Sequence, residues 1–228
     1  MPAESTKRTK LRVFLVDDHP LVRKGIADCI HDEPDMAVCG QAATAEEALE
    51  GVARTKPDLA LVDISLPGCD GIELTKDIKA EYPRIQVLVL SMHDESLYAQ
   101  RALRAGASGY VMKSAPAGAL IQAIRGVRAG KTVVSPRLRD QLIQFMVGNA
   151  KRPSVQQLSD RELQVLRLYG EGRTRGQIAT QLHLSIKTVE THRSNICRKL
   201  GLKNSTEFLR YAIELIRPQI RQPAQSQD

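Results

Sequence analysis

Between residues 11 and 129, short apolar runs alternate with longer segments of helical periodicity, and this alternation limits the chain to few folds. The runs cover residues 13–16, 36–39, 59–62, 85–90 and 109–112. They are almost entirely apolar, as is typical of strands that are buried on both faces. Strands that alternate with helices form a parallel sheet covered by helices on both sides. We therefore predict a five-stranded, doubly wound α/β domain.

The residues after 154 show only helical patterns. Ser159 and Thr174 each begin a capping box, because Glu162 and Gln177 follow three positions later. The expected helices cover about residues 159–169, 174–182, 186–200 and 205–216, and the last should end before Pro218. A tight turn joins the second and third helices, as in a helix-turn-helix. The sequence thus predicts a separate all-α domain of four helices.

Turn residues between these patterns divide the chain into five segments. We expect a disordered tail at 1–10, the α/β domain at 11–130, a linker at 131–154, the helical domain at 155–217 and a flexible tail at 218–228. Within the linker, Ser135 and Pro136 should begin a helix. The apolar face of this helix carries Leu138, Leu142, Ile143 and Met146.

The two predicted domains differ in charge. The chain has 228 residues and a net charge of +7. Residues 1–150 contain 19 basic and 19 acidic residues, whereas residues 151–228 contain 14 basic and 7 acidic residues. All the excess positive charge belongs to the helical part, which suits the binding of a polyanion such as nucleic acid.

The sequence argues against a secreted or membrane protein. Its N-terminus is polar, and no apolar run approaches the ~20 residues of a membrane helix. The four cysteines, at positions 29, 39, 69 and 197, match no zinc or redox spacing. We therefore expect a cytoplasmic protein with reduced thiols and no membrane partner.

Polar residues follow four of the five apolar runs. Asp17 and Asp18 follow the first run, Asp63 the third, Ser91 the fourth and Lys113 the fifth. These side chains should converge, because ligands bind at the carboxyl ends of parallel strands. Three carboxylates would repel one another unless a divalent cation such as Mg²⁺ lay between them. Lys113 and Ser91 could bind phosphoryl oxygens, and Asp63 is the natural nucleophile, because carboxylates form aspartyl-phosphates.

The third helix of the helical domain has one apolar and one polar face. On a helical wheel, Val189, Ile196 and Leu200 form the buried stripe. The opposite face and its edges carry Lys187, Glu190, Thr191, Ser194, Asn195 and Arg198. A polar, basic face on the second helix of a helix-turn-helix suits the major groove of DNA.

Residues 11–130 resemble the receiver domain of bacterial two-component response regulators. The motifs that carry the resemblance are VDDH at 16–19, LVDISLP at 61–67 and GCDG at 68–71. Ser91, Tyr110 and Lys113 also match positions that the family uses. The resemblance implies the strand order 2-1-3-4-5, with Asp63 as the phospho-acceptor.

The same resemblance implies a metal site and a switch. Mg²⁺ would be bound by Asp18, Asp63 and the backbone carbonyl of Ser65, with Asp17 acting through water. Ser91 and Tyr110 would be the switch residues, and Tyr110 would move inward after phosphorylation. One departure is that Ser114 stands where many receivers have proline. This departure leaves the isomer of the Lys113–Ser114 peptide open.

Residues 155–217 look like a LuxR-type helix-turn-helix domain. The motifs are LSDRELQVL at 158–166, IA at 178–179, TVETH at 188–192 and KLG at 199–201. The similarity implies base contacts near Glu190, Thr191 and Ser194. It also implies phosphate contacts from Lys187, His192, Arg193 and Lys203.

The whole chain thus resembles the NarL/FixJ family of response regulators. The resemblance implies a transcription factor, not an enzyme, in which a sensor histidine kinase phosphorylates Asp63. The protein would then dimerise and bind double-stranded DNA, with RNA polymerase as a further partner. A phosphatase that acts through an aspartyl-phosphate is disfavoured, because Ser65 stands where such enzymes commonly have a second acid. A regulator with a degenerate receiver is disfavoured because all five phosphorylation residues are present.

Overall fold

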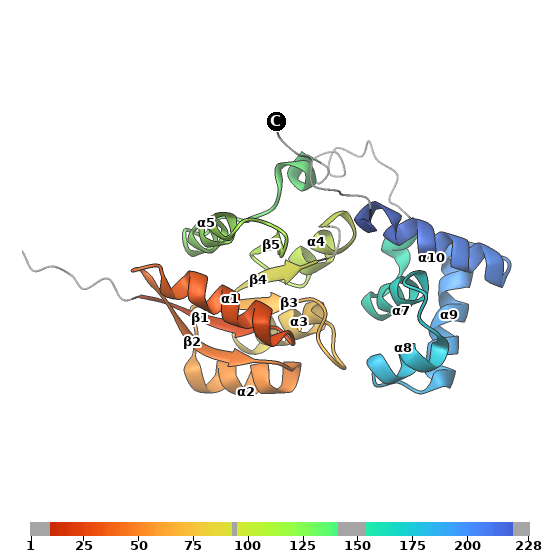
Figure 1. Cartoon of the computed structure of the whole chain (residues 1–228), viewed down its shortest axis with the longest axis horizontal. Coiled ribbons are helices and arrows are strands. Elements are labelled where there is room, and N and C mark those ends of the chain that lie inside the picture. Colours follow the sequence, from red (N-terminus) through yellow and green to blue (C-terminus); the bar gives the residue numbers. More distant parts are fainter. Residues whose placement is uncertain (1–9, 93–94, 141–153, 221–228) are drawn as a thin grey trace, which may run out of the picture. The chain divides into compact units, whose positions relative to one another are not determined.

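A computed structural model of the chain describes residues 10–92, 95–140 and 154–220. The chain divides into two compact units, an α/β domain and an all-helical domain nearer the C-terminus. Figure 1 labels their helices and strands. Within the described ranges, no helix is long and apolar enough to cross a membrane.

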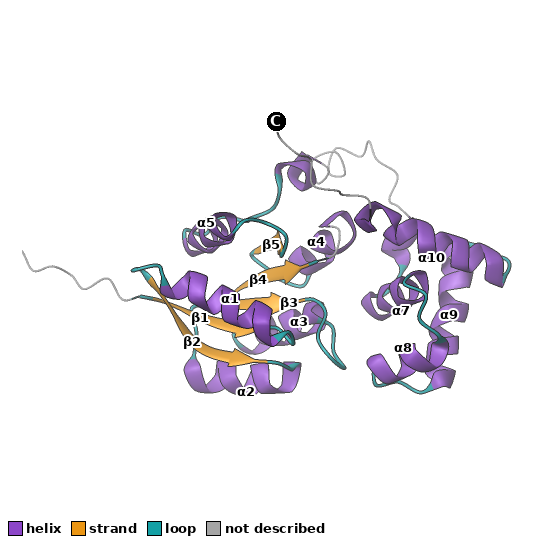
Figure 2. Cartoon of the chain, viewed as in Figure 1, coloured by secondary structure: helices purple, strands orange, loops and turns teal. Residues whose placement is uncertain are grey.

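The α/β domain is built on one five-stranded parallel sheet (Figure 2). Its strands are β1 (Leu11–Val16), β2 (Met36–Ala42), β3 (Leu59–Asp63), β4 (Gln86–Ser91) and β5 (Gly109–Met112). Their order is β2-β1-β3-β4-β5, and every neighbouring pair is parallel. Both the parallel sheet and the expected strand order are therefore confirmed.

Helices cover both faces of this sheet. They are α1 (Pro20–His31), α2 (Ala45–Thr55), α3 (Gly71–Glu81), α4 (Glu95–Arg104) and α5 (Ala117–Arg128). Helices α1 and α5 pack together on one face, and α2 and α3 pack together on the other (Figure 1). Consecutive strand residues such as Leu61, Val62, Leu88 and Val89 are all buried. Burial on both faces explains why the runs lack the alternation of a half-exposed strand.

The ring of Phe14 fills the space between β2 and α2 and is almost completely buried. A Cβ atom at Gly40 of β2 would lie 2.4 Å from this ring, and a Cβ atom at Gly51 of α2 would lie 2.3 Å from it. Neither distance is compatible with an ordinary contact. The two glycines therefore give the ring the room it needs.

The helical domain begins with a short 3-10 helix, η1 (Ser154–Gln157). It continues with α7 (Asp160–Gly170), α8 (Arg175–Gln181), α9 (Ile186–Leu200) and α10 (Ser205–Ile220). Both capping boxes form as predicted, with Ser159 and Glu162 at α7 and Thr174 and Gln177 at α8. Gly201 adopts a φ of 68° and ends α9.

The predicted end of the last helix is wrong, because α10 continues past Pro218 to Ile220. A proline inside a helix removes one backbone hydrogen bond and crowds the preceding turn. Here only two helical residues follow it, so little of the helix is affected. In the predicted linker helix, residues 136–140 are helical and Leu138 is buried. Its other apolar positions lie outside the described residues, as do residues 1–9 and 221–228 of the tails predicted at 1–10 and 218–228. The predicted C-terminal tail begins too early, because residues 218–220 belong to α10.

An ion pair between a half-buried lysine and a buried glutamate joins α7 to α9. Lys199 Nζ lies 2.6 Å from Glu162 Oε2, and the Glu162 side chain is only 5% exposed. The same oxygen accepts a hydrogen bond from the backbone N–H of Ser159 at 2.7 Å. Burial acts to raise the pKa of Glu162, but the bonds from Lys199 and Ser159 outweigh it and hold the pKa below its ordinary value. The charged form of Glu162 is therefore the one that stabilises the folded domain.

We predict that Gly51→Ala destabilises the α/β domain relative to Gly25→Ala. Nothing lies within 4 Å of a Cβ at Gly25 of α1. Both substitutions remove a helical glycine, which favours the helix by about 1 kcal/mol. Only the alanine at position 51 overlaps a buried ring, at a cost of about 1–3 kcal/mol. Urea unfolding followed by circular dichroism should show this difference, and equal stabilisation by both variants would contradict it.

We also predict that Lys199→Met lowers the stability of the helical domain at pH 7 by about 1–3 kcal/mol, because it leaves the Glu162 carboxylate buried without its cation. The folded pKa of Glu162 is depressed, so its contribution is present above its unfolded pKa and is lost as the pH falls through the folded pKa. The difference from wild type should therefore shrink below about pH 4.5. The difference in stability is measured from urea unfolding midpoints between pH 7 and pH 3. Lys203→Met, which removes an exposed lysine, is the control. A loss that stays constant down to pH 3 would refute the prediction.

Candidate functional site

The ends of three strands bring two buried carboxylates and one buried amine together. Asp17 follows β1, Asp63 ends β3 and Lys113 follows β5. Lys113 Nζ lies 2.7 Å from Asp17 Oδ2 and 2.7 Å from Asp63 Oδ2. The side chains of the two acids are 3% exposed and that of the lysine is 7% exposed. The structure thus places these three residues in one ion-paired cluster, which we call the acidic pocket.

Burial controls the electrostatics of this pocket. It raises the pKa of Asp63, the charge of Asp17 raises it further, and the attraction of Lys113 only partly offsets both. Burial acts to lower the pKa of Lys113, but the two carboxylates outweigh it and raise that pKa. Lys113 therefore favours its ammonium form, and the charged form of Asp63 is poorly solvated. A poorly solvated carboxylate is stabilised when it binds a cation or reacts with an electrophile.

Asp18 and His19 complete the pocket. One ligand atom from each of Asp17, Asp18, His19 and Asp63 lies within 4.8 Å of all the others. His19 Nδ1 lies 2.6 Å from Asp18 Oδ1, and the His19 backbone N–H donates to Asp17 Oδ1 at 2.9 Å. The contact between His19 and Asp18 was not predicted from the sequence. Three carboxylates at this spacing are a hard, anionic donor set, which fits Mg²⁺.

The loop after Asp63 is held close to the Asp63 carboxylate. The Ser65 backbone N–H forms a hydrogen bond with the Asp63 carboxylate. Gly71 N–H donates to the Ile64 carbonyl at 2.9 Å, and a Cβ atom at Gly71 would lie 1.9 Å from the Asp63 carbonyl oxygen. Asp70 is buried and caps α3 by accepting from Ile72 N–H at 2.9 Å. Only glycine at position 71 allows the start of α3 to approach the backbone of Asp63 this closely.

The two predicted switch residues are both buried. Ser91 ends β4 and is completely buried, and Tyr110 of β5 is 2% exposed. The Tyr110 side chain is therefore inside the protein in this structure, which is the position expected for it after phosphorylation. The described residues contain no cis peptide bond, so the Lys113–Ser114 peptide is trans.

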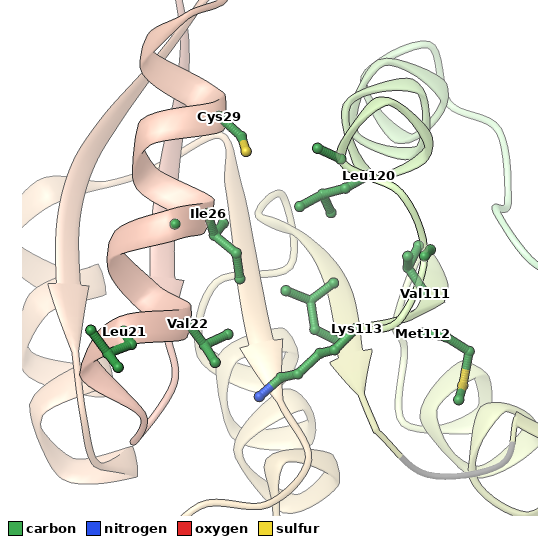
Figure 3. A pocket seen from close by; sticks show the side chains of 12 residues that line it. Leu21, Val22, Ile26, Cys29, Val111, Met112, Lys113 and Leu120 are labelled. Atoms are coloured by element: carbon green, nitrogen blue, oxygen red, sulfur yellow. The ribbon is translucent and has the colours of Figure 1, made fainter. Parts of the chain in front are cut away.

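An apolar cleft of about 210 Å³ lies beside the acidic pocket (Figure 3). Leu21, Val22 and Ile26 of α1 form one wall, and Val111 and Leu120 lie across from them. Lys113 lines the same cleft, so its methylene chain lies against apolar groups while its amine reaches the two carboxylates. This packing restricts the lysine side chain to the direction that the pocket requires.

Helix α9 has the two faces predicted for it. Val189 and Ile196 are fully buried, and Leu200 is half-buried. Ser185 begins the helix by accepting from Thr188 N–H at 3.0 Å. The predicted DNA-contacting residues that are exposed are Lys187, Glu190, Thr191, Ser194 and Arg198 on α9, and Lys203 after it.

His192 and Arg193 differ from these residues because both are half-buried. Arg193 Nη2 donates to Ser205 Oγ at 2.6 Å, and its guanidinium carbon lies 5.2 Å from the centre of the Phe208 ring. Arg193 therefore attaches α9 to α10, a role that the sequence did not reveal. Burial lowers the pKa of His192, which favours the neutral imidazole.

Arg175 is a further residue that the sequence did not point to. It begins α8, and its Nη1 lies 2.7 Å from Glu190 Oε1 on α9. The two residues are 15 positions apart and belong to different helices. No local pattern connects them, so only the fold reveals the pair.

Comparison with known proteins agrees with both domains. Residues 13–125 match the response regulator receiver domain, and residues 156–212 match the bacterial regulatory proteins of the luxR family. One relative is the oxygen regulatory protein NreC of Staphylococcus aureus strain JH9. It is 37% identical over 211 residues, which cover 90% of this chain and 97% of NreC.

Solved structures show the same relationship. A LuxR-family two-component response regulator from Aurantimonas sp. SI85-9A1 is 40% identical, with a TM-score of 0.57, over 61% of this chain and 99% of that chain. RcsB from Salmonella enterica serovar Typhimurium, bound to promoter rprA in the presence of phosphomimetic BeF3⁻, is 26% identical. Its TM-score is 0.65, over 90% of this chain and 99% of RcsB. The chain therefore belongs to the response regulators of two-component systems that join a receiver domain to a LuxR-type DNA-binding domain.

Proposed function

We propose that Asp63 accepts a phosphoryl group from a sensor histidine kinase and that this modification controls DNA binding by α9. The observation that carries the proposal is the buried cluster in which Lys113 contacts both Asp17 and Asp63 at 2.7 Å. Such a site can bind the charges of a phosphoryl group before and after transfer. Because its target is chromosomal DNA, the protein would act in the cytoplasm.

The phosphoryl transfer uses the groups of the acidic pocket. An Asp63 carboxylate oxygen attacks phosphorus as the bond between phosphorus and the kinase histidine nitrogen breaks. The electron pair of that bond returns to the nitrogen, and the histidine, protonated on its other ring nitrogen, leaves as neutral imidazole. Asp17, Asp18, Asp63 and the Ser65 carbonyl would hold Mg²⁺, which when bound supplies positive charge to the phosphoryl oxygens. Lys113 would bind another of these oxygens as a cation, and the Ser91 hydroxyl would donate to a third. Ser65 offers no acid for a second, hydrolytic half-reaction, which favours a regulator over an enzyme.

The helical domain would give the output. Its excess of basic residues suits the phosphates of DNA, and the exposed side of α9 suits the major groove. We infer that the phosphorylated protein acts as a homodimer and communicates with RNA polymerase. The promoter complex of RcsB with a phosphomimetic supports DNA binding by a similar protein in this state.

We predict that Asp63→Asn abolishes covalent phosphorylation. The full-length protein is incubated with acetyl phosphate and Mg²⁺, and intact mass measures the gain of one phosphoryl group. Wild type should be labelled, and EDTA should prevent labelling because the carboxylates lose their cation. Asp77→Asn, which changes an exposed acid of α3, is the matched control and should be labelled like wild type.

Lys113→Ala tests the role of the amine, with DNA binding measured before and after treatment with acetyl phosphate. The substitution leaves the three carboxylates in place, so Mg²⁺ should still bind, but phosphorylation should no longer increase DNA binding. Label that persists in Asp63→Asn, or that forms fully in EDTA, would refute the assignment of the acceptor.

We further predict that Lys187→Ala and Thr191→Ala weaken DNA binding in different ways. Lys187 is a long cation that can reach phosphates, so its loss should weaken binding to all duplexes equally and reduce the log–log salt slope by about one. Thr191 is uncharged, so its loss should cost about 1–3 kcal/mol at the preferred site only and leave the slope unchanged.

A salt titration on preferred and scrambled duplexes measures both effects. Lys131→Ala, which removes an exposed cation of the α/β domain, should leave affinity and slope unchanged. Arg193 is a poor probe of phosphate contact, because its removal also breaks the contacts with Ser205 and Phe208. Equal losses and equal slopes for Lys187→Ala and Thr191→Ala would exclude α9 as the helix in the groove.

A further inference from the structure

We propose that Glu190 reads a cytosine in the major groove and that Arg175 positions the Glu190 carboxylate for this contact. The inference rests on the proposed binding of DNA by α9. It goes further by naming one base pair of the target and a positioning residue that lies outside the recognition helix.

The argument begins with the ion pair between α8 and α9. Arg175 Nη1 lies 2.7 Å from Glu190 Oε1, and the two side chains are 66% and 48% exposed. An ion pair this exposed adds little to the stability of a protein. Its physical effect is on orientation, because it selects one direction for a carboxylate that would otherwise sample several rotamers. When DNA excludes water from the groove, the attraction between the two groups also becomes stronger.

Arg175 is not needed to form α8. It is the first residue of the helix, where a cation opposes the helix dipole. The helix start is already capped without it. The Thr174 backbone N–H donates to Gln177 Oε1 at 2.9 Å, and the Gln177 backbone N–H donates to Thr174 Oγ1 at 3.3 Å. The stability of α8 therefore does not account for an arginine at this position, whereas the contact with Glu190 does.

The side chains next to Glu190 indicate which base groups would fit. Thr191 Oγ1 donates to the Lys187 carbonyl at 2.9 Å, and Ser194 Oγ donates to the Glu190 carbonyl at 3.0 Å. Both hydroxyl protons are thus used within α9, so these oxygens face outward as acceptors. A carboxylate accepts hydrogen bonds as well. The centre of the exposed face therefore suits the amino groups of bases, which are cytosine N4 and adenine N6.

Cytosine suits a carboxylate better than adenine does. In the major groove, adenine N6 lies beside the acceptor N7, which repels an anion. Cytosine N4 lies beside a carbon-bound hydrogen, so no acceptor repels the carboxylate there. The Glu190 carboxylate therefore suits the cytosine of a C·G base pair.

Selection of binding sites from random duplexes by the phosphorylated full-length protein tests this inference. Glu190→Gln identifies the position that residue 190 reads, because it changes the preferred base there. We expect wild type to prefer cytosine at that position in each half-site by about tenfold. Glu190→Gln should prefer adenine at the same position, because glutamine pairs with both N6 and N7 of adenine. Preferences at the other positions should not change.

Variants of Arg175 separate its effect on the orientation of the Glu190 carboxylate from the general effect of a positive charge on DNA affinity. Arg175→Ala should remove most of the preference for cytosine, and Arg175→Lys should keep part of it. Arg173→Ala, which removes an exposed cation two residues earlier, should leave the preference intact whatever its effect on affinity. Adding Arg175→Ala to Glu190→Gln should not alter the preference for adenine, since the ion pair is already absent. Circular dichroism confirms that each variant is folded.

The possible failures are distinguishable. Suppose that wild type selects a defined site and that Glu190→Gln changes the preferred base at one position of it. If wild type does not prefer cytosine at that position, the assignment of the base is wrong. If Arg175→Ala keeps the full preference for cytosine, its positioning role is wrong. If phosphorylated wild type selects no site at all, the proposed function fails and this inference fails with it.

Discussion

The ion pairs of Lys113 hold the receiver site together. The sheet order places β1 beside β3, so Asp17 and Asp63 lie at the ends of neighbouring strands. Strand β4 lies between β3 and β5. Only a long cationic side chain can extend from the end of β5 to both carboxylates, and the amine does so at 2.7 Å from each. The apolar cleft keeps this side chain in its direction. The positive charge of Lys113 offsets the repulsion between the two carboxylates, so they can lie close together in the pocket.

One carboxylate has a comparable role in the helical domain. Glu162 completes the capping box of α7 and also accepts from Lys199 of α9. Local helix formation and the packing of the recognition helix therefore depend on the same buried charge. Arg193 makes a second connection, because it binds Ser205 and lies over the Phe208 ring. Helix α9 is thus fixed along its inner side to α7 and to α10.

The sequence predicted the sheet and the residues of the acidic pocket well, because both follow from local patterns and one rule about parallel strands. Asp63 could be placed simply by asking which residue ends each apolar run. The contact of His19 with Asp18 and the bond of Arg175 with Glu190 could not be predicted, because they depend on rotamers and on helices that meet only in the fold. The end of α10 was wrong because proline is usually a stop signal, yet near a helix end it costs only one hydrogen bond.

The division of α9 into two faces has a consequence for how such a protein evolves. The residues that attach the helix to its domain are on the inner side, as with Val189, Ile196 and Arg193. On the outer side, Glu190 contacts the exposed Arg175, and Thr191 contacts the backbone of α9. Substitution on the outer side leaves the core unchanged. A duplicated gene could therefore acquire a new set of target promoters through a few mutations, while the folding of the domain and the phosphorylation chemistry of the receiver remain as they were.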